Sequence, residues 1–144
     1  MIAHDWIEVI YSYPIDSPHG QNVLAVMSCA MAEVMMEDLL KNILFHQSAR
    51  YEHIEILLDL HEGRNRQLQL FKKLCGSALK ESLNSLKMVD FYDAWERITL
   101  SRNKFVHGTP PGNQYRDFPA AEDLETVRTK ILAAFCALHN GFAV

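Results

Sequence analysis

The sequence predicts an all-α fold, a four- to five-helix up-and-down bundle, and three observations support this prediction. Apolar residues recur at three- and four-residue spacings over most of the chain, which is the period of an amphipathic helix. No run of alternating apolar and polar residues marks a series of strands. The chain contains six Gly and five Pro, and four of these residues fall within 108–112, so the remainder has few helix breakers.

The length indicates one domain. At 144 residues the chain is close to the commonest size of a single domain, and we expect residues 19–144 to form one helical bundle domain. Residues 1–18 are an N-terminal segment of uncertain structure, because their aromatic stretch fits a strand and a short helix equally well. Ser17 followed by Pro18 predicts a helix start, with Ser as the cap and Pro in the first helical position.

The first predicted helix runs from Pro18 to about Phe45, and its apolar face is unusually wide. Such a face is typical of a central bundle helix, or of a helix that also serves a subunit interface. Gly76 is placed to kink or divide a later helical stretch, and Gly108 ends another. The further predicted helices cover residues 51–60, 64–88, 90–107 and 119–139.

Composition excludes several classes of protein. The net charge of −4 argues against a broadly basic nucleic-acid binder. Three widely spaced cysteines without a C-x-x-C pattern are typical of free thiols in a reducing cytoplasm, where we expect the protein to reside. The most apolar stretch, 23–32, is half the length of about 20 residues that a bilayer-spanning helix needs, so we expect no membrane association. No spacing of His, Cys, Asp or Glu indicates a metal site, and we expect no metal and no cofactor.

Arg102 has an unusual position on the predicted 90–107 helix. The apolar stripe of that helix runs through Phe91, Trp95 and Ile98, and Arg102 follows Ile98 by four residues. A guanidinium in line with a buried face is costly unless it is paired or lines a cleft.

Two interpretations of Arg102 are open. In the first, Arg102 forms a salt bridge with a core carboxylate, Glu33 or Glu37, of the first long helix. In the second, Arg102 lines a binding cleft near the end of its own helix, where it can bind phosphate.

His107 follows Arg102 by five residues and lies in the last turn of the same helix. Exposed carbonyls at a helix end favour the protonated imidazole, and an imidazole that gains or releases a proton near neutral pH suits acid–base chemistry. The alternative role for His107 is to cap the helix carbonyls.

The segment 102–107, Arg-Asn-Lys-Phe-Val-His, resembles the R-x4–6-H signature of the HEPN domain family, in which a polar residue often follows the Arg. The family has an all-α bundle fold. The layout is similar as well, with a long first helix bearing acidic residues, a basic second stretch, and a last helix after a loop. The resemblance covers roughly residues 19–140, and the short motif is its specific part.

The resemblance implies metal-independent RNA cleavage by a homodimer, in which two motifs meet across a two-fold interface. It assigns acid–base catalysis to His107, phosphate binding to Arg102 and a positioning role to Asn103. The planar fork of Arg suits bidentate phosphate recognition. The resemblance further implies the toxin half of a toxin–antitoxin or phage-defence pair, with an antitoxin or other regulatory protein as partner.

A basic segment also favours RNA. Residues 64–89 carry six basic side chains and one acidic side chain, a local charge of +5 in an acidic chain. Such a segment can line a phosphate-binding surface, and the alternative is an ordinary solvated helix face. The candidate RNA-binding residues are Arg64, Arg66, Lys72 and Lys73.

A competing hypothesis is a non-catalytic helical module that binds a protein or a nucleotide. Such a module would resemble the mannitol-operon repressor type of regulator, or a HEPN relative without nuclease activity. The acidic composition and the wide apolar first helix fit it equally well. This hypothesis predicts that Arg102 is buried in the salt bridge with Glu33 or Glu37 and that His107 only caps its helix.

Overall fold

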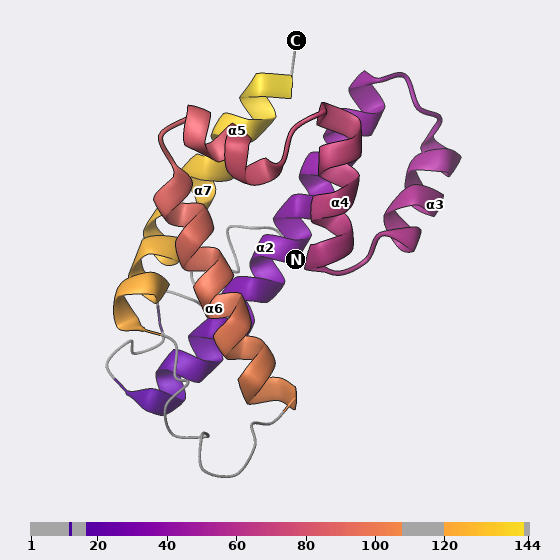
Figure 1. Ribbon diagram of the computed structural model, residues 1–144. Coiled ribbons are helices and arrows are strands. Elements are labelled where there is room, and N and C mark those ends of the chain that lie inside the picture. Colours follow the sequence, from indigo (N-terminus) through magenta and orange to yellow (C-terminus); the bar gives the residue numbers. More distant parts are fainter. Residues whose placement is uncertain (1–11, 13–16, 108–119, 143–144) are drawn as a thin grey trace. The chain divides into compact units, whose positions relative to one another are not determined.

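The computed structural model describes residue 12 and residues 17–107 and 120–142, with the backbone alone for 18–19, 104–107 and 142. Within these ranges the chain forms six helices and no strand, so the predicted all-α class is confirmed (Figure 1). The helices are α2 (Pro18–His46), α3 (Tyr51–Leu60), α4 (Arg64–Cys75), α5 (Leu79–Ser85), α6 (Val89–His107) and α7 (Ala121–Phe142).

Gly76 divides the stretch 64–88 into two helices, which raises the number of described helices above the four to five predicted. Gly76 has a φ of 80°, in the left-handed region that glycine adopts without steric cost. Its N–H donates to the carbonyl oxygen of Lys72 at 2.9 Å, so it closes the last turn of α4 as a C-cap. The three-residue gap before α5 follows from this cap.

The sequence predicted where the two longest helices, α2 and α7, begin or end, and the structure agrees with one of these predictions more closely than with the other. Ser17 Oγ accepts the N–H of Gly20 at 3.1 Å, which confirms the predicted cap of α2. The end of α7 was predicted less well, since the helix passes through Asn140 and Gly141 and ends at Phe142. One glycine in a terminal turn costs only about 1 kcal/mol relative to alanine, and this cost does not stop a helix whose preceding turns are packed.

We predicted that residues 19–144 form one domain. In the structure these residues are divided between two compact units. The first unit comprises residues 1–32 and 90–131, and the second unit comprises residues 33–89 and 132–144. Both α2 and α7 therefore contribute one part to each unit.

The core of the first unit combines the beginning of α2, most of α6 and the beginning of α7. Its buried apolar residues follow the helical three-four spacing, as the sequence predicted for each element. Trp95 is completely buried, with its ring stacked on Phe91 at 5.8 Å between centroids and edge-on to Tyr92 at 6.1 Å. The set is Leu24, Ala25, Cys29, Met31, Ala32, Phe91, Ala94, Trp95, Ile98, Leu124, Val127 and Ile131.

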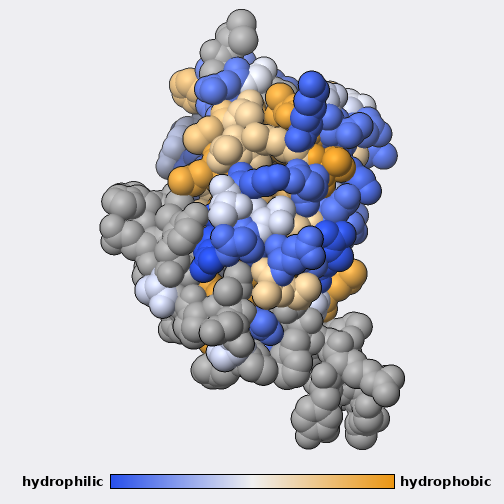
Figure 2. Space-filling view, turned by 90° about the vertical axis from the view of Figure 1, so that its left-hand side faces the viewer, coloured by the Kyte–Doolittle hydropathy of each residue, from blue (hydrophilic) through white to orange (hydrophobic). Residues whose placement is uncertain are grey.

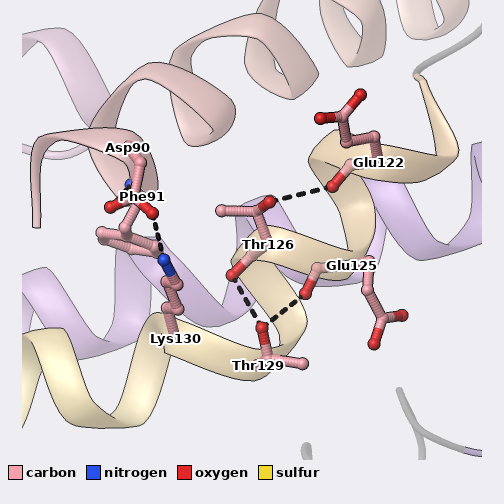
Figure 3. Close-up of polar contacts among 7 residues, drawn as sticks. All are labelled: Asp90, Phe91, Glu122, Glu125, Thr126, Thr129 and Lys130. Atoms are coloured by element: carbon pink, nitrogen blue, oxygen red, sulfur yellow. Dashed lines mark hydrogen bonds and ion pairs between the residues drawn. The ribbon is translucent and has the colours of Figure 1, made fainter.

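Polar contacts connect α6 to α7 within the first unit. The Lys130 ammonium of α7 pairs with the carboxylate of Asp90 in the first turn of α6 (Figure 3). Asp90 Oδ1 also accepts the N–H of Phe91 at 2.9 Å. Along α7, the Thr126 and Thr129 hydroxyls donate to the carbonyl oxygens of Glu122 and Glu125 (Figure 3).

We expect the contribution of Asp90 to stability to depend on pH. The hydrogen bond from Lys130 lowers the pKa of Asp90 below its usual value. Ionised Asp90 therefore stabilises the fold above its unfolded pKa of about 3.9, and this stabilisation is lost as the pH falls through the lower folded pKa. Because the pair is exposed, Asp90→Asn should cost about 0.2–1 kcal/mol at pH 6 and nearly nothing at pH 2, as measured by urea unfolding.

Asp59→Asn is the matched control for Asp90→Asn, because Asp59 is an exposed aspartate of α3 that makes no ion pair with any described residue. Its effect should be small at both pH values. An Asp90→Asn cost that is equal at both pH values would show that the ion pair with Lys130 does not contribute to stability.

The second unit contains the end of α2, the helices α3, α4 and α5, and the end of α7. Gln67 is a buried polar residue of α4, and its Nε2 donates to the backbone oxygen of Glu33 in α2 at 3.0 Å. Gln47 Nε2, after the end of α2, donates to the Leu74 carbonyl oxygen at 3.3 Å. The buried apolar residues are Met35, Met36, Leu39, Leu40, Ile43, Leu44, Ile54, Leu58, Leu70, Phe71, Leu79, Leu83, Ala134, Phe135 and Leu138.

On the face drawn in Figure 2, hydrophobic side chains are interspersed with hydrophilic ones. In the part of the chain that the structure covers, no helix is both long enough and apolar enough to cross a membrane. No disulfide bond joins Cys29, Cys75 and Cys136.

Candidate functional site

Arg102 lies on the last described turns of α6, in line with the packed face of that helix. Phe91, Trp95 and Ile98 are completely buried, which confirms the predicted stripe. Arg102 continues the stripe and is partly exposed, whereas its Nε atom is buried. The inner nitrogen of its guanidinium is therefore covered by protein atoms, and the residue as a whole reaches solvent.

The helix turn before Arg102 is fixed by a buried polar contact between α6 and α2. Thr99 Oγ1 donates its single proton to the carbonyl oxygen of Trp95 at 2.7 Å. Cys29 Sγ lies 3.7 Å from Thr99 Oγ1, so the thiol is the donor in that contact. Both residues are buried, and they hold the helix that carries Arg102 against the beginning of α2.

Asn103 is partly exposed and lies beside Arg102 on α6. His107 is the last residue of α6, and its side chain lies outside the described part of the chain. The catalytic roles of Arg102, Asn103 and His107 therefore stay predictions. The structure places the backbone of all three on one helix, with Arg102 and Asn103 in its last described turns.

Arg97 is the other arginine of α6, and it has a structural partner. Its Nε and Nη2 donate to the two carboxylate oxygens of Asp123 in the first turn of α7, each at 2.9 Å. This bidentate pair raises the pKa of Arg97 and connects α6 to α7. Arg97 directly precedes Ile98 and lies off the apolar stripe, and no sequence spacing connects it to Asp123, which is in the first turn of α7.

Glu33 and Glu37 belong to the second unit, and Arg102 belongs to the first. Glu33 is partly exposed, and its backbone oxygen accepts the Gln67 amide. Glu37 is exposed on α2. The salt bridge from Arg102 to one of these carboxylates stays a prediction.

The four basic candidates of α4 differ in exposure. Arg66, Lys72 and Lys73 are exposed, whereas Leu70 of the same helix is buried. Arg64 is partly buried, and its Nε and Nη2 atoms are inaccessible to solvent. Three of the four candidates are thus available to a phosphate backbone.

In the described part of the chain, no group of three or more His, Cys, Asp or Glu residues is arranged to hold a metal ion. No protein-family model matches the chain, and no curated protein or solved structure matches it either. A function is therefore inferred from the geometry of α6 and the chemistry of its residues.

Proposed function

We propose that this chain is a HEPN-type, metal-independent endoribonuclease with a composite active site at a homodimer interface. One observation carries the proposal. Arg102 extends the completely buried stripe of α6 and yet reaches solvent, with its inner nitrogen in the packing. Such a guanidinium is carried by a packed helix that holds it in orientation, and its planar fork can bind a phosphate.

The proposed reaction is attack of an RNA 2′-hydroxyl on the adjacent phosphorus. One His107 imidazole takes the proton of the 2′-hydroxyl, and His107 of a second protomer protonates the leaving 5′-oxygen. Arg102 stabilises the charge on the phosphorane, and Asn103 orients the reacting groups. The bond from phosphorus to the 5′-oxygen breaks, and the products carry a 2′,3′-cyclic phosphate and a 5′-hydroxyl.

The proposal includes an up-and-down, HEPN-like arrangement of the helices and a cytoplasmic RNA substrate. The exposed Arg66, Lys72 and Lys73 of α4 support an RNA-binding role, because exposed lysine and arginine side chains attract the phosphate backbone. An antitoxin or another regulatory protein is the proposed partner, and a toxin or defence role would follow from RNA cleavage.

Incubation of the purified chain with mixed RNA in EDTA tests the proposal. We expect cleavage products with 2′,3′-cyclic phosphate ends, and light scattering should give the mass of a dimer. A preparation purified in parallel from cells that lack the chain controls for contaminating nucleases. Cleavage that requires added Mg²⁺, or a monomeric mass, would contradict the proposed mechanism.

A non-catalytic interaction module, binding a protein or a nucleotide, is the second candidate. Ile56 and Leu60 of α3 favour a protein partner, since both are exposed and lie one helical turn apart. The absence of cleavage by a folded dimer would favour this function over the nuclease.

A further inference from the structure

The second unit contains a pocket of about 520 Å³ lined by α2, α3 and α7. Its volume is typical of small-molecule sites, which range over roughly 300–1,000 Å³. The pocket is independent of Arg102 and of the proposed nuclease site, because all of its lining residues belong to the second unit. The lining residues are Asp38, Lys41, Asn42, Phe45, Tyr51, Ile54 and His139.

Two aromatic side chains of the pocket are mostly open to solvent. Phe45, near the end of α2, is 69% exposed, and Tyr51, at the start of α3, is 66% exposed. Exposed rings next to the buried Ile54 form an apolar wall that a ligand can cover. This wall favours a ligand with an apolar part.

The lining also carries one acidic and one basic side chain at adjacent positions. Asp38 and Lys41 are three residues apart on α2, so they lie on the same side of the helix. Asp38 is exposed and makes no ion pair with any described residue. Lys41 Nζ lies 3.6 Å from a Glu55 carboxylate oxygen, and both side chains are nearly half exposed, so the pair is weak and leaves Lys41 able to bind another anion.

A hydrogen bond orients the imidazole at the α7 side of the pocket. Asn42 Nδ2 and His139 Nδ1 are 3.2 Å apart, although the residues are 97 positions apart in sequence. Because the amide nitrogen donates, His139 Nδ1 accepts and the N–H of the imidazole is at Nε2. His139 therefore adds a second hydrogen-bond donor to the ammonium of Lys41.

The charges of the lining select the class of ligand. Lys41 and Asp38 give the lining one ammonium and one carboxylate, so a simple anion would meet the charge of Asp38 and a simple cation would meet that of Lys41. We infer that the pocket binds a free α-amino acid with an apolar side chain. The ammonium of the ligand pairs with Asp38, its carboxylate pairs with Lys41 and His139, and its side chain covers Phe45 and Tyr51.

Isothermal titration calorimetry with L-phenylalanine and two derivatives tests this inference. N-acetyl-L-phenylalanine lacks the ammonium, and L-phenylalaninamide lacks the carboxylate. We expect saturable binding of L-phenylalanine, and about tenfold weaker binding of each derivative, because each loses one charge-assisted hydrogen bond.

Two variants assign the two charges. Lys41→Gln should weaken binding of L-phenylalanine and leave it no tighter than that of the amide. Asp38→Asn should weaken it and leave it no tighter than that of the N-acetyl derivative. Lys73→Gln is the matched control, since Lys73 is an exposed lysine of α4 outside the lining, and it should leave the affinity unchanged.

The absence of saturable binding by L-phenylalanine at millimolar concentration would overturn the inference. Equal affinity for the parent and the N-acetyl derivative would overturn it too, as would equal weakening by Lys41→Gln and Lys73→Gln. Circular dichroism of each variant checks that the protein whose affinity is measured is folded. Because Asp38 and Lys41 lie at the surface, we expect both variants to fold.

Discussion

Alanine in place of His107 is expected to lower the rate of RNA cleavage by about 10²–10⁴-fold, because a positioned proton-transfer group contributes that much to catalysis. The wild-type rate should show a bell-shaped dependence on pH, since one imidazole acts as base while the other acts as acid. Initial rates on a fluorogenic oligoribonucleotide from pH 5 to pH 9 measure both effects. His53→Ala is the matched control, because His53 is an exposed histidine of α3.

The same assay applies to Arg102, with Arg97 as its control on the same helix. Arg102→Ala should reduce cleavage by about 10²–10³-fold, the usual cost of removing one group that stabilises developing charge. Arg97→Ala should leave cleavage nearly unchanged, because Arg97 pairs with Asp123 instead. If Arg102→Ala and Arg97→Ala cleave RNA at the same rate, Arg102 is not part of the active site.

Local signals explain which parts of the fold the sequence predicted correctly. The hydroxyl of Ser17 and the left-handed conformation of Gly76 act within one helical turn, so residue type and spacing are enough to identify them. The stripe of Phe91, Trp95 and Ile98 is also local, because helical periodicity determines it. The same periodicity places Arg102 in line with this stripe.

Contacts between distant residues explain what the sequence did not reveal. The pair of Asn42 with His139, like the bond from Gln67 to Glu33, depends on how helices far apart in the chain meet. Neither hydrogen bond joins residues at a regular sequence spacing, so one sequence alone does not predict it. The pocket was missed for the same reason, since its lining comes from three helices.

The buried stripe of α6 also links the candidate site to the stability of the first unit. Trp95 lies two helical turns before Arg102, on the same face, and Thr99 between them connects the helix to Cys29 of α2. A substitution that loosens this packing removes the support of the Arg102 stem. Stability and catalysis should therefore respond together to changes at Trp95, whereas changes at His107 should affect catalysis alone.

Trp95→Ala is expected to destabilise the protein by about 3–5 kcal/mol, the cost of emptying a large buried aromatic site. Trp95 is 0% exposed and stacks on Phe91, so its removal leaves a cavity that neighbouring helices can close only in part. Urea unfolding should show a lower midpoint with an unchanged slope. Leu100→Ala is the matched control, because Leu100 is 58% exposed on the same helix, and its effect should stay within about 0.5 kcal/mol.

Trp95→Phe separates the loss of volume from the loss of an aromatic contact. Phenylalanine keeps a ring that can stack on Phe91 and fills part of the site, so we expect a cost well below that of alanine. Equal midpoints for Trp95→Ala and Leu100→Ala would mean that the α6 stripe does not form the core of the first unit. The rigid support proposed for Arg102 would then have no physical basis, because an unpacked helix cannot hold a guanidinium in one orientation.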